Sequence, residues 1–149
     1  MKSIKELYRI GTGPSSSHTM GPRKAAEIFL ARHRNAASFK VTLYGSLAAT
    51  GKGHMTDVAI NDTLTPVAPV EIVWQPKVFL PFHPNAMTFA AFDARQKLLE
   101  NWTVYSIGGG ALAENNEEPT IESKEVYDMR SMTEILNWCE RTGKSYWEY

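Results

Sequence analysis

The sequence predicts a mixed α/β fold, in the α+β sense of one partly antiparallel sheet with helices packed on it. Segments with the periodicity of strands and of helices interleave along the 149 residues, which is typical of a single sheet covered by helices. Several strand candidates follow one another with no helix between them, which predicts that some neighbouring strands pair antiparallel. The apolar share of 43% is enough for a domain with a core of its own.

The first half of the chain alternates helix, strand and helix. Residues 22–33 are predicted as a helix because four apolar side chains share one face at helical spacing. These are Ala25, Ala26, Phe29 and Leu30. His33, among cations at the end of this helix, is interpreted as a solvated residue. Residues 39–44 alternate polar and apolar side chains, as a half-buried strand does. Residues 47–60 form the next predicted helix, which two internal glycines weaken.

The second half is richer in strands. Four short apolar runs, each bounded by Pro, Gly or Asn, are predicted as strands. They cover residues 70–74, 78–80, 87–92 and 102–107. A capping box formed by Ser131 and Glu134 predicts a last helix, which Gly143 ends. Cys139 lies on the apolar face of that helix and is interpreted as a small core residue.

Charge and cysteine content exclude several classes of protein. Lys plus Arg and Asp plus Glu number 16 each, so the net charge is zero and a nucleic-acid binder, which carries a basic excess, is not predicted. Zero net charge also limits solubility, which fits a chain that sits against a partner. The single cysteine allows no internal disulfide and no multi-cysteine metal site. Without an apolar run of transmembrane length or a secretory segment, the sequence predicts a cytoplasmic protein with no membrane contact.

The most informative segment is G-P-S-S-S-H-T-M-G-P at residues 13–22. Hydroxyl and imidazole side chains stand together there, directly before a predicted helix. The start of a helix offers free backbone N–H groups and the positive end of its dipole, which suit a small carboxylate or phosphate. Helix capping is the alternative, and it accounts for one or two of these side chains but not for three serines and a histidine. Both interpretations stay open at this point.

Three more segments place polar groups next to glycines, at residues 45–57, 82–85 and 108–110. Polar residues on glycine-rich loops at strand ends are where α/β proteins build sites. A P-loop is excluded in the first of them, because five residues rather than four separate its glycines and no Ser or Thr follows the lysine. Each segment also has an ordinary explanation, such as a turn, a surface ion pair or an interior histidine. No spacing supports a metal site on His18 and His83. The residues alone therefore predict a small-anion site with a histidine that can act as a base.

Four motifs together resemble one protein family. They are G-P-S-S-S-H-T-M-G-P at residues 13–22, Y-G-S-L-A-A-T-G-K-G-H-M-T-D at 44–57, F-H-P-N-A-M at 82–87 and Y-S-I-G-G-G at 105–110. In this order they resemble the β domain of the bacterial iron–sulfur-dependent L-serine dehydratases, also called L-serine ammonia-lyases, over residues 1–149. The chain is also similar to the small-anion-binding (allosteric substrate) domain of some phosphoglycerate dehydrogenases. It departs from the dehydratase pattern at Met55 and Ala86, where the family usually has glycine, and residues 60–82 are short for the family.

The resemblance implies an enzyme, a carbon–nitrogen lyase that converts L-serine to pyruvate and ammonia in amino-acid metabolism and gluconeogenesis. It implies a [4Fe–4S] cluster held by cysteines of a catalytic α domain or subunit that this chain lacks, and no metal in this chain itself. The full enzyme is expected to be a homodimer, and the isolated chain to be inactive. A non-catalytic module that senses serine or a small anion is the alternative, and a docking domain for the α partner is a third hypothesis.

The resemblance also assigns roles residue by residue. His18 and His83 are expected to exchange protons with the substrate, with His18 the first candidate for the base. The expected substrate contacts are Ser15, Ser16, Ser17, Thr19 and Asn85. The expected supporting residues are Gly45, Ser46, Lys52, His54, Gly108, Gly109 and Gly110.

Overall fold

A five-stranded sheet with the strand order β2-β1-β3-β4-β5 organises the larger part of the computed structural model. The structure describes residues 9–114 and 126–149, which fall into two compact units. The strands are β1 Ser38–Tyr44, β2 Val70–Gln75, β3 Ala86–Phe92, β4 Leu98–Gly108 and β5 Ala111–Ala113. Strands β1 and β2 pair parallel and the other neighbours pair antiparallel. The predicted mixed, partly antiparallel sheet is therefore confirmed.

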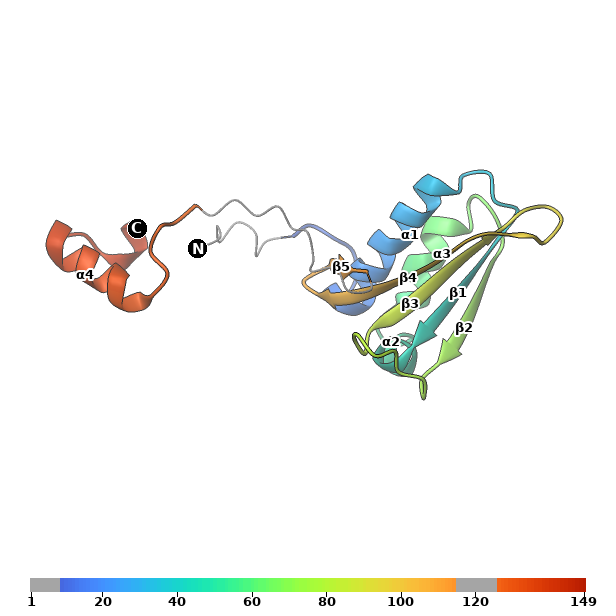
Figure 1. Ribbon diagram of the computed structural model, residues 1–149, viewed down its shortest axis with the longest axis horizontal. Helices are drawn as coiled ribbons and strands as arrows, with labels where there is room; N and C mark the ends of the chain where they lie inside the picture. The colour runs from blue at the N-terminus through green and yellow to red at the C-terminus, as the bar shows by residue number, and fades with distance from the viewer. Residues whose placement is uncertain (1–8, 115–125) are drawn as a thin grey trace. The chain divides into compact units, whose positions relative to one another are not determined.

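Helices α1 and α3 lie side by side on one face of this sheet (Figure 1). The helices of this unit are α1 Gly21–Arg32, α2 Gly45–Thr50 and α3 Thr56–Leu64, and a π-helical turn, η2 Ser16–Met20, leads into α1. Because α2 begins at the residue after β1 ends, the chain turns directly from an inner strand of the sheet into a helix. The turn η2 and the start of α2 contribute residues to the candidate site described below.

The core lies between α1 and the sheet. Strand β1 alternates buried and half-buried side chains along its whole length, as its sequence pattern predicted. Phe29 of α1 is fully buried, with ring centroids 5.5 Å from Phe89 and 6.1 Å from both Phe39 and Trp102. Four aromatic rings from one helix and three strands therefore hold α1 on the sheet.

The sequence predicted one helix over residues 47–60, and the structure has two, α2 and α3. The chain between them turns because Gly51 packs where a side chain would not fit: an added Cβ would lie 2.2 Å from the carbonyl oxygen of Leu47. Met55 then adopts a left-handed backbone conformation, with φ at 57°, which a helix cannot continue through. The prediction of a continuous helix was wrong because periodicity does not reveal such a backbone reversal.

The predicted strand at residues 78–80 was also wrong. Pro76 and Pro81 bracket it and cannot donate ladder hydrogen bonds. The segment is instead a loop whose Val78 carbonyl accepts a hydrogen bond from the N–H of Gly45, at 2.9 Å. Strand β4 is longer than predicted, and β5 was missed because three residues are too few to show a pattern.

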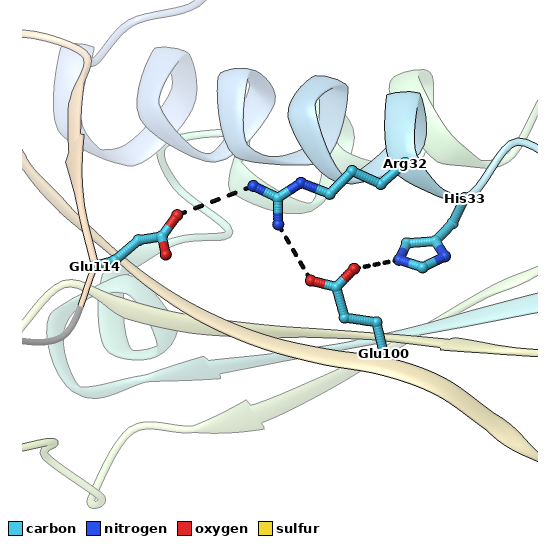
Figure 2. A network of polar contacts seen from close by, with 4 residues as sticks. All are labelled: Arg32, His33, Glu100 and Glu114. Atoms are coloured by element: carbon cyan, nitrogen blue, oxygen red, sulfur yellow. Dashed lines mark hydrogen bonds and ion pairs between the residues drawn. The ribbon is translucent and has the colours of Figure 1, made fainter.

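A polar network ties the end of α1 to β4 (Figure 2). Arg32 and His33 both contact the carboxylate of Glu100, at 3.1 and 2.5 Å, and Arg32 also lies 3.9 Å from Glu114. The guanidinium of Arg32 packs over the Trp102 ring, 4.7 Å from its centroid. His33 thus hydrogen-bonds a carboxylate and its side chain is only 15% exposed, so its interpretation as a solvated residue was wrong. Burial opposes ionisation of Glu100, but the hydrogen bonds from His33 and Arg32 outweigh it and lower the pKa of Glu100.

Residues 126–149 form the second unit, which contains α4 Met132–Thr142 and a 3₁₀ turn, η3 Tyr146–Glu148. The predicted capping box is confirmed, since Ser131 and Glu134 bond each other's backbone N–H. Gly143 ends the helix in the left-handed conformation, as predicted, with φ at 69°. No residue of α4 is buried, so Cys139 is half-exposed rather than in a core.

Replacing Glu100 by Gln is expected to destabilise the larger unit by on the order of 1 kcal/mol at pH 7, because the carboxylate that pairs with Arg32 and contacts His33 becomes neutral. The pKa of Glu100 is lowered on folding, so its ionised form stabilises the fold above about pH 4.5 and this contribution is lost as the pH falls through the folded-state pKa. Urea denaturation at pH 7 and pH 3.5 should show a difference between variant and wild type at pH 7 that shrinks at pH 3.5. The matched control is Glu71→Gln, since Glu71 pairs with Lys40 at 3.4 Å but is 64% exposed. Equal effects of the two variants would contradict the role of the network.

Candidate functional site

The centre of the site is the turn η2, which is wound around Ser15. The hydroxyl of Ser15 accepts a hydrogen bond from the N–H of His18 at 3.1 Å. Its carbonyl oxygen accepts from the N–H groups of Thr19 and Met20, at 3.0 and 3.1 Å. Serine is a preferred residue at this capping position. Capping therefore explains Ser15, as the first interpretation of this loop allowed, and the tight turn fixes where the His18 ring lies.

The imidazole of His18 has a hydroxyl partner at each nitrogen. Ser17 Oγ lies 2.9 Å from Nδ1 and Ser46 Oγ lies 3.2 Å from Nε2. Ser46 belongs to the first turn of α2, at the end of β1, so two segments 28 residues apart meet at one ring. In a neutral imidazole one nitrogen donates and the other accepts. One of the two hydroxyls therefore donates to the ring while the other accepts from it.

His54 lies against His18, with ring centroids 4.9 Å apart. Its Nδ1 is 3.0 Å from the carbonyl oxygen of Thr50. A carbonyl can only accept a hydrogen bond, so Nδ1 carries the proton of the neutral ring and Nε2 keeps a free lone pair. His54 was expected only as a supporting residue, and the structure gives it the hydrogen-bonding state that a general base needs.

The surroundings of His18 keep its ring neutral. Burial disfavours the charged form and is the main reason why the pKa of His18 is lowered, and electrostatic repulsion from the neighbouring His54 ring lowers it further. The contact with Ser46 acts in the opposite direction but does not outweigh these effects. Near neutral pH the ring is therefore unprotonated at one nitrogen and can accept a proton.

Two buried threonines lock the two histidine segments together. Thr19 Oγ1 donates to the carbonyl oxygen of His54 at 2.6 Å, and Thr56 Oγ1 donates to the carbonyl oxygen of His18 at 2.5 Å. The hydroxyl proton of Thr19, an expected substrate contact, is thus already used inside the protein. Thr56 was not singled out from the sequence, although it lies within the motif at residues 44–57. Its signal was only a hydroxyl at the start of a helix, which usually indicates a cap.

The loop at residues 82–85 packs onto the same strand end. The N–H of Ser46 donates to the carbonyl oxygen of Pro84 at 3.0 Å. Gly45 makes this approach possible, because its φ is +48° and an added Cβ would lie only 2.6 Å from that oxygen. Ser46 therefore links this loop to the His18 ring. Within the described residues no hydrogen bond or ring contact joins His18 directly to His83.

His83 has the opposite hydrogen-bonding state to His54. The backbone N–H of Asn85 donates to His83 Nδ1 at 3.1 Å, so the proton of the neutral ring lies on Nε2. Asn85 also donates from its side-chain amide to the carbonyl oxygen of Ser106, at 3.3 Å. The side-chain oxygens of Asn85 and Ser106 are buried and have no hydrogen-bond partner in the described structure. Ser106, which the sequence analysis missed as an individual residue, lies at the back of the site against Gly21.

The remaining predicted residues are Ser16, Lys52 and the three glycines at 108–110. Ser16 is exposed at the start of η2. Lys52 is exposed, with its ammonium 5.6 Å from the centroid of the Trp74 ring, and points to the outer strand β2. Gly108 ends β4, and Gly109 and Gly110 form the turn to β5, where Gly110 adjoins Met20 of η2. The structure thus brings the histidine, serine and asparagine candidates to one end of the sheet and leaves Lys52 outside.

Residues 9–114 and 126–149 contain no group of three or more His, Cys, Asp or Glu side chains that could hold a metal ion. No helix in the same ranges is long and apolar enough to cross a membrane.

Comparison with known proteins shows which family this chain resembles. The family model of the serine dehydratase beta chain matches residues 3–72 and 61–117. This chain belongs to the serine dehydratase β chain family. The resemblance stated from the four motifs is therefore confirmed.

Individual members of the serine dehydratase family align with nearly the whole chain. L-serine dehydratase TdcG of Escherichia coli (strain K12) is 34% identical and covers 97% of the chain. The L-serine dehydratases of Mycobacterium tuberculosis (strain CDC 1551 / Oshkosh) and Helicobacter pylori (strain J99 / ATCC 700824) are 35% and 31% identical, each over 96% of it. The chain spans about two fifths of the length of these relatives, with 41%, 40% and 41% of their sequences aligned.

The comparison also bears on the differences between this serine dehydratase β chain and its family. The alignment with the Escherichia coli relative has 189 positions, more than the 149 residues of the chain, so the relative has residues that this chain lacks. The family model matches in two pieces, which overlap at residues 61–72 of this chain. This supports the expectation that the segment following residue 60 is short. In the structure that segment is the connection from α3 to the outer strand β2.

At the two positions where the resemblance led us to expect glycine, Met55 and Ala86, the backbone conformations differ. Ala86 begins β3 as a fully buried strand residue with ordinary backbone angles. Met55 is left-handed, which is the conformation that favours glycine. The cost of a side chain in this conformation is about 1–2 kcal/mol.

Replacing Met55 by Gly is therefore expected to stabilise the chain by roughly 0.5–1 kcal/mol, after the extra backbone entropy of glycine in the unfolded state is subtracted. Urea denaturation at pH 7 measures the change. Val58→Gly, three residues later inside α3, is the matched control and should destabilise by about 1 kcal/mol. A destabilised Met55→Gly variant would show that the side chain makes contacts worth more than the strain.

Replacing His54 by Gln is expected to raise the pKa of His18 toward the ordinary value of 6.5, because the electrostatic repulsion between the two rings is removed while burial remains. NMR titration of the imidazole C–H signals measures this pKa directly. His33→Gln, at the opposite end of α1, is the control and should leave the His18 titration unchanged. An unchanged or lowered pKa in His54→Gln would rule out the electrostatic coupling of the two rings.

Proposed function

We propose that this chain is the β part of an L-serine dehydratase that converts L-serine to pyruvate and ammonia, and that it forms one wall of the substrate site. The observation that carries the proposal is the His18 imidazole, held between two hydroxyls and kept neutral against a second imidazole in a member of the serine dehydratase β chain family. The other wall belongs to an α domain or subunit. The homodimer, the cytoplasmic location and the place in amino-acid metabolism stay predictions from the resemblance.

The [4Fe–4S] cluster that the resemblance implies does not fit this chain. Such clusters are held mainly by cysteine thiolates, and the sequence contains one cysteine, Cys139. The described residues also provide no alternative metal-binding group. The cluster therefore belongs to the α part, where it would supply a Lewis acid for the hydroxyl group that serine loses.

The chemical task of this chain is to move a proton. The Cα–H of serine is a weak acid, so its removal needs a base within hydrogen-bonding reach. The imidazole of His18 takes this proton in the proposal, because its pKa is lowered and one ring nitrogen is unprotonated. The free lone pair of His54 Nε2, next to it, makes His54 the second candidate. Loss of the Cα proton and of the hydroxyl group as water leaves aminoacrylate, which tautomerises to an imine and hydrolyses to pyruvate and ammonia.

Substrate binding falls to the turn η2 and the 82–85 loop. The first N–H groups of a helix have no partner within the helix and suit a carboxylate. The exposed Ser16 and its neighbour Ser17 lie at this helix start. The N–H that the neutral ring of His83 carries on Nε2 can donate to an oxygen of the substrate. Asn85 holds His83 through its backbone N–H, which makes it a positioning residue in this scheme.

Replacing His18 by Ala in an enzyme with both parts present is expected to lower kcat by about 10²–10⁴-fold, the usual contribution of a positioned acid or base. Steady-state pyruvate formation measures kcat, and the visible absorbance of the cluster shows whether the α part is intact. His54→Ala and His83→Ala, measured in parallel, rank the three imidazoles. His33→Ala is the control outside the site and should keep wild-type turnover if the fold is intact. Near-normal turnover of His18→Ala would remove His18 from the role of base.

The same experiment separates catalysis from sensing. A split active site predicts no serine turnover by the isolated chain and activity when the α part is added. A self-contained sensor would bind millimolar serine alone, and substitutions at His18 would then change binding while leaving turnover of the complete enzyme unaffected.

A further inference from the structure

Helix α4 carries an apolar stripe in which two side chains are exposed and two are half-buried. Met132, Ile135, Leu136 and Cys139 recur at the spacing i, i+3, i+4 and i+7, which places them on one face of a helix. Met132 is 58% exposed and Leu136 is 50% exposed. Charged and polar side chains occupy the opposite face. This amphipathic pattern is typical of a helix that packs against another element along one side.

Among the described residues 126–149, the hydrogen bonds and ring contacts hold the ends of the segment, and none of those given involves a side chain of this stripe. The Tyr149 ring lies 5.4 Å from Trp138 and 5.5 Å from Tyr127. Its hydroxyl donates to Asp128 at 2.5 Å and accepts from the N–H of Met129 at 2.8 Å. Trp138 lies on the flank of the helix rather than within the stripe. An isolated helix of eleven residues is marginal in water, so α4 needs a partner along its apolar side.

Helix α4 lies outside the residues that the family model of the β chain matches. The family model of the β chain ends at residue 117, before α4 begins. The L-serine dehydratases nevertheless align over 96–97% of this chain, so their alignments continue into residues 126–149. Only 41% of those enzymes is aligned. Helix α4 is therefore shared with the L-serine dehydratases but lies beyond the residues that the β chain model matches.

We propose that α4 is the first structural element of the α part and that its apolar stripe packs against that part, not against the β unit or a second copy of this chain. Residues 126–149 belong to a different compact unit from the sheet. The inference rests on the proposed function in one respect, the existence of an α part that completes the enzyme. In this proposal, the packing of α4 holds the α part and the β chain together.

Cys139 provides a native probe for this contact. It is the single cysteine of the chain and lies in the stripe. Iodoacetamide should alkylate it readily in the isolated chain, and mass spectrometry of the peptide that contains Cys139 measures the rate. Addition of the α part as a separate chain should slow alkylation at least tenfold. Slow alkylation in the isolated chain, or an unchanged rate in the complex, would overturn the proposal.

A pair of variants tests the stripe itself. Leu136→Glu should weaken association with the α part at least tenfold in analytical ultracentrifugation, whereas Asn137→Glu, on the polar face, should leave it unchanged. Circular dichroism and thermal unfolding of both variants show whether the sheet unit is intact. A wild-type chain that sediments as a dimer and a Leu136→Glu variant that sediments as a monomer would identify a second copy as the occupant, against the proposal.

The outcomes for the inference and for the proposed function are distinct. If a complex forms and protects Cys139 but does not turn over serine, the proposed function fails and the packing of α4 stands. If the complex turns over serine while Cys139 stays reactive and Leu136→Glu binds normally, the proposed function stands and the packing of α4 is wrong.

Discussion

The arrangement of the site depends on the close approach of two backbones at the end of β1. Gly45 leaves the strand in a left-handed conformation and meets the carbonyl oxygen of Pro84 at a distance that no side chain would allow. The next residue, Ser46, bonds that carbonyl through its N–H and the His18 ring through its hydroxyl. One dipeptide therefore fixes the distance between the η2 turn and the 82–85 loop. A side chain at residue 45 would move both.

The sheet gives this dipeptide a rigid base. Strand β1 lies between β2 and β3, and its apolar side chains pack beneath α1 through the ring cluster around Phe29. The network of Arg32, His33 and Glu100 anchors the far end of α1 on β4. Helix α1 is thus held at its C-terminal end by charge and along its length by aromatic contacts. These two sets of contacts fix the helix and, with it, its N-terminal end, where η2 and His18 lie.

Local patterns predicted most of the elements, and contacts between distant segments account for what they missed. Alternation in residues 39–44 and helical spacing around Phe29 reflect burial on one face, which one sequence shows directly. The break between α2 and α3 was not visible as such, because its left-handed residue is a methionine, not a glycine. His33 was misread because its partner, Glu100, lies 67 positions away. The site residues were found as motifs, but the contacts that give them roles span 28, 35 and 38 positions. The hydrogen-bonding states of His54 and His83 follow from backbone groups of Thr50 and Asn85 that carry no signal in the sequence.

The double hydroxyl contact of His18 has a consequence for what the site presents to an incoming ligand. When the ring gains a proton, both of its nitrogens become donors, and Ser17 and Ser46 must then both act as acceptors. The hydroxyl that had pointed its hydrogen at the ring must rotate and turn that hydrogen outward. Each proton that reaches the ring is thereby converted into a change in the direction of a neighbouring O–H bond. The imidazole and its two serines form a unit in which charge uptake and the reorientation of a surface donor occur together.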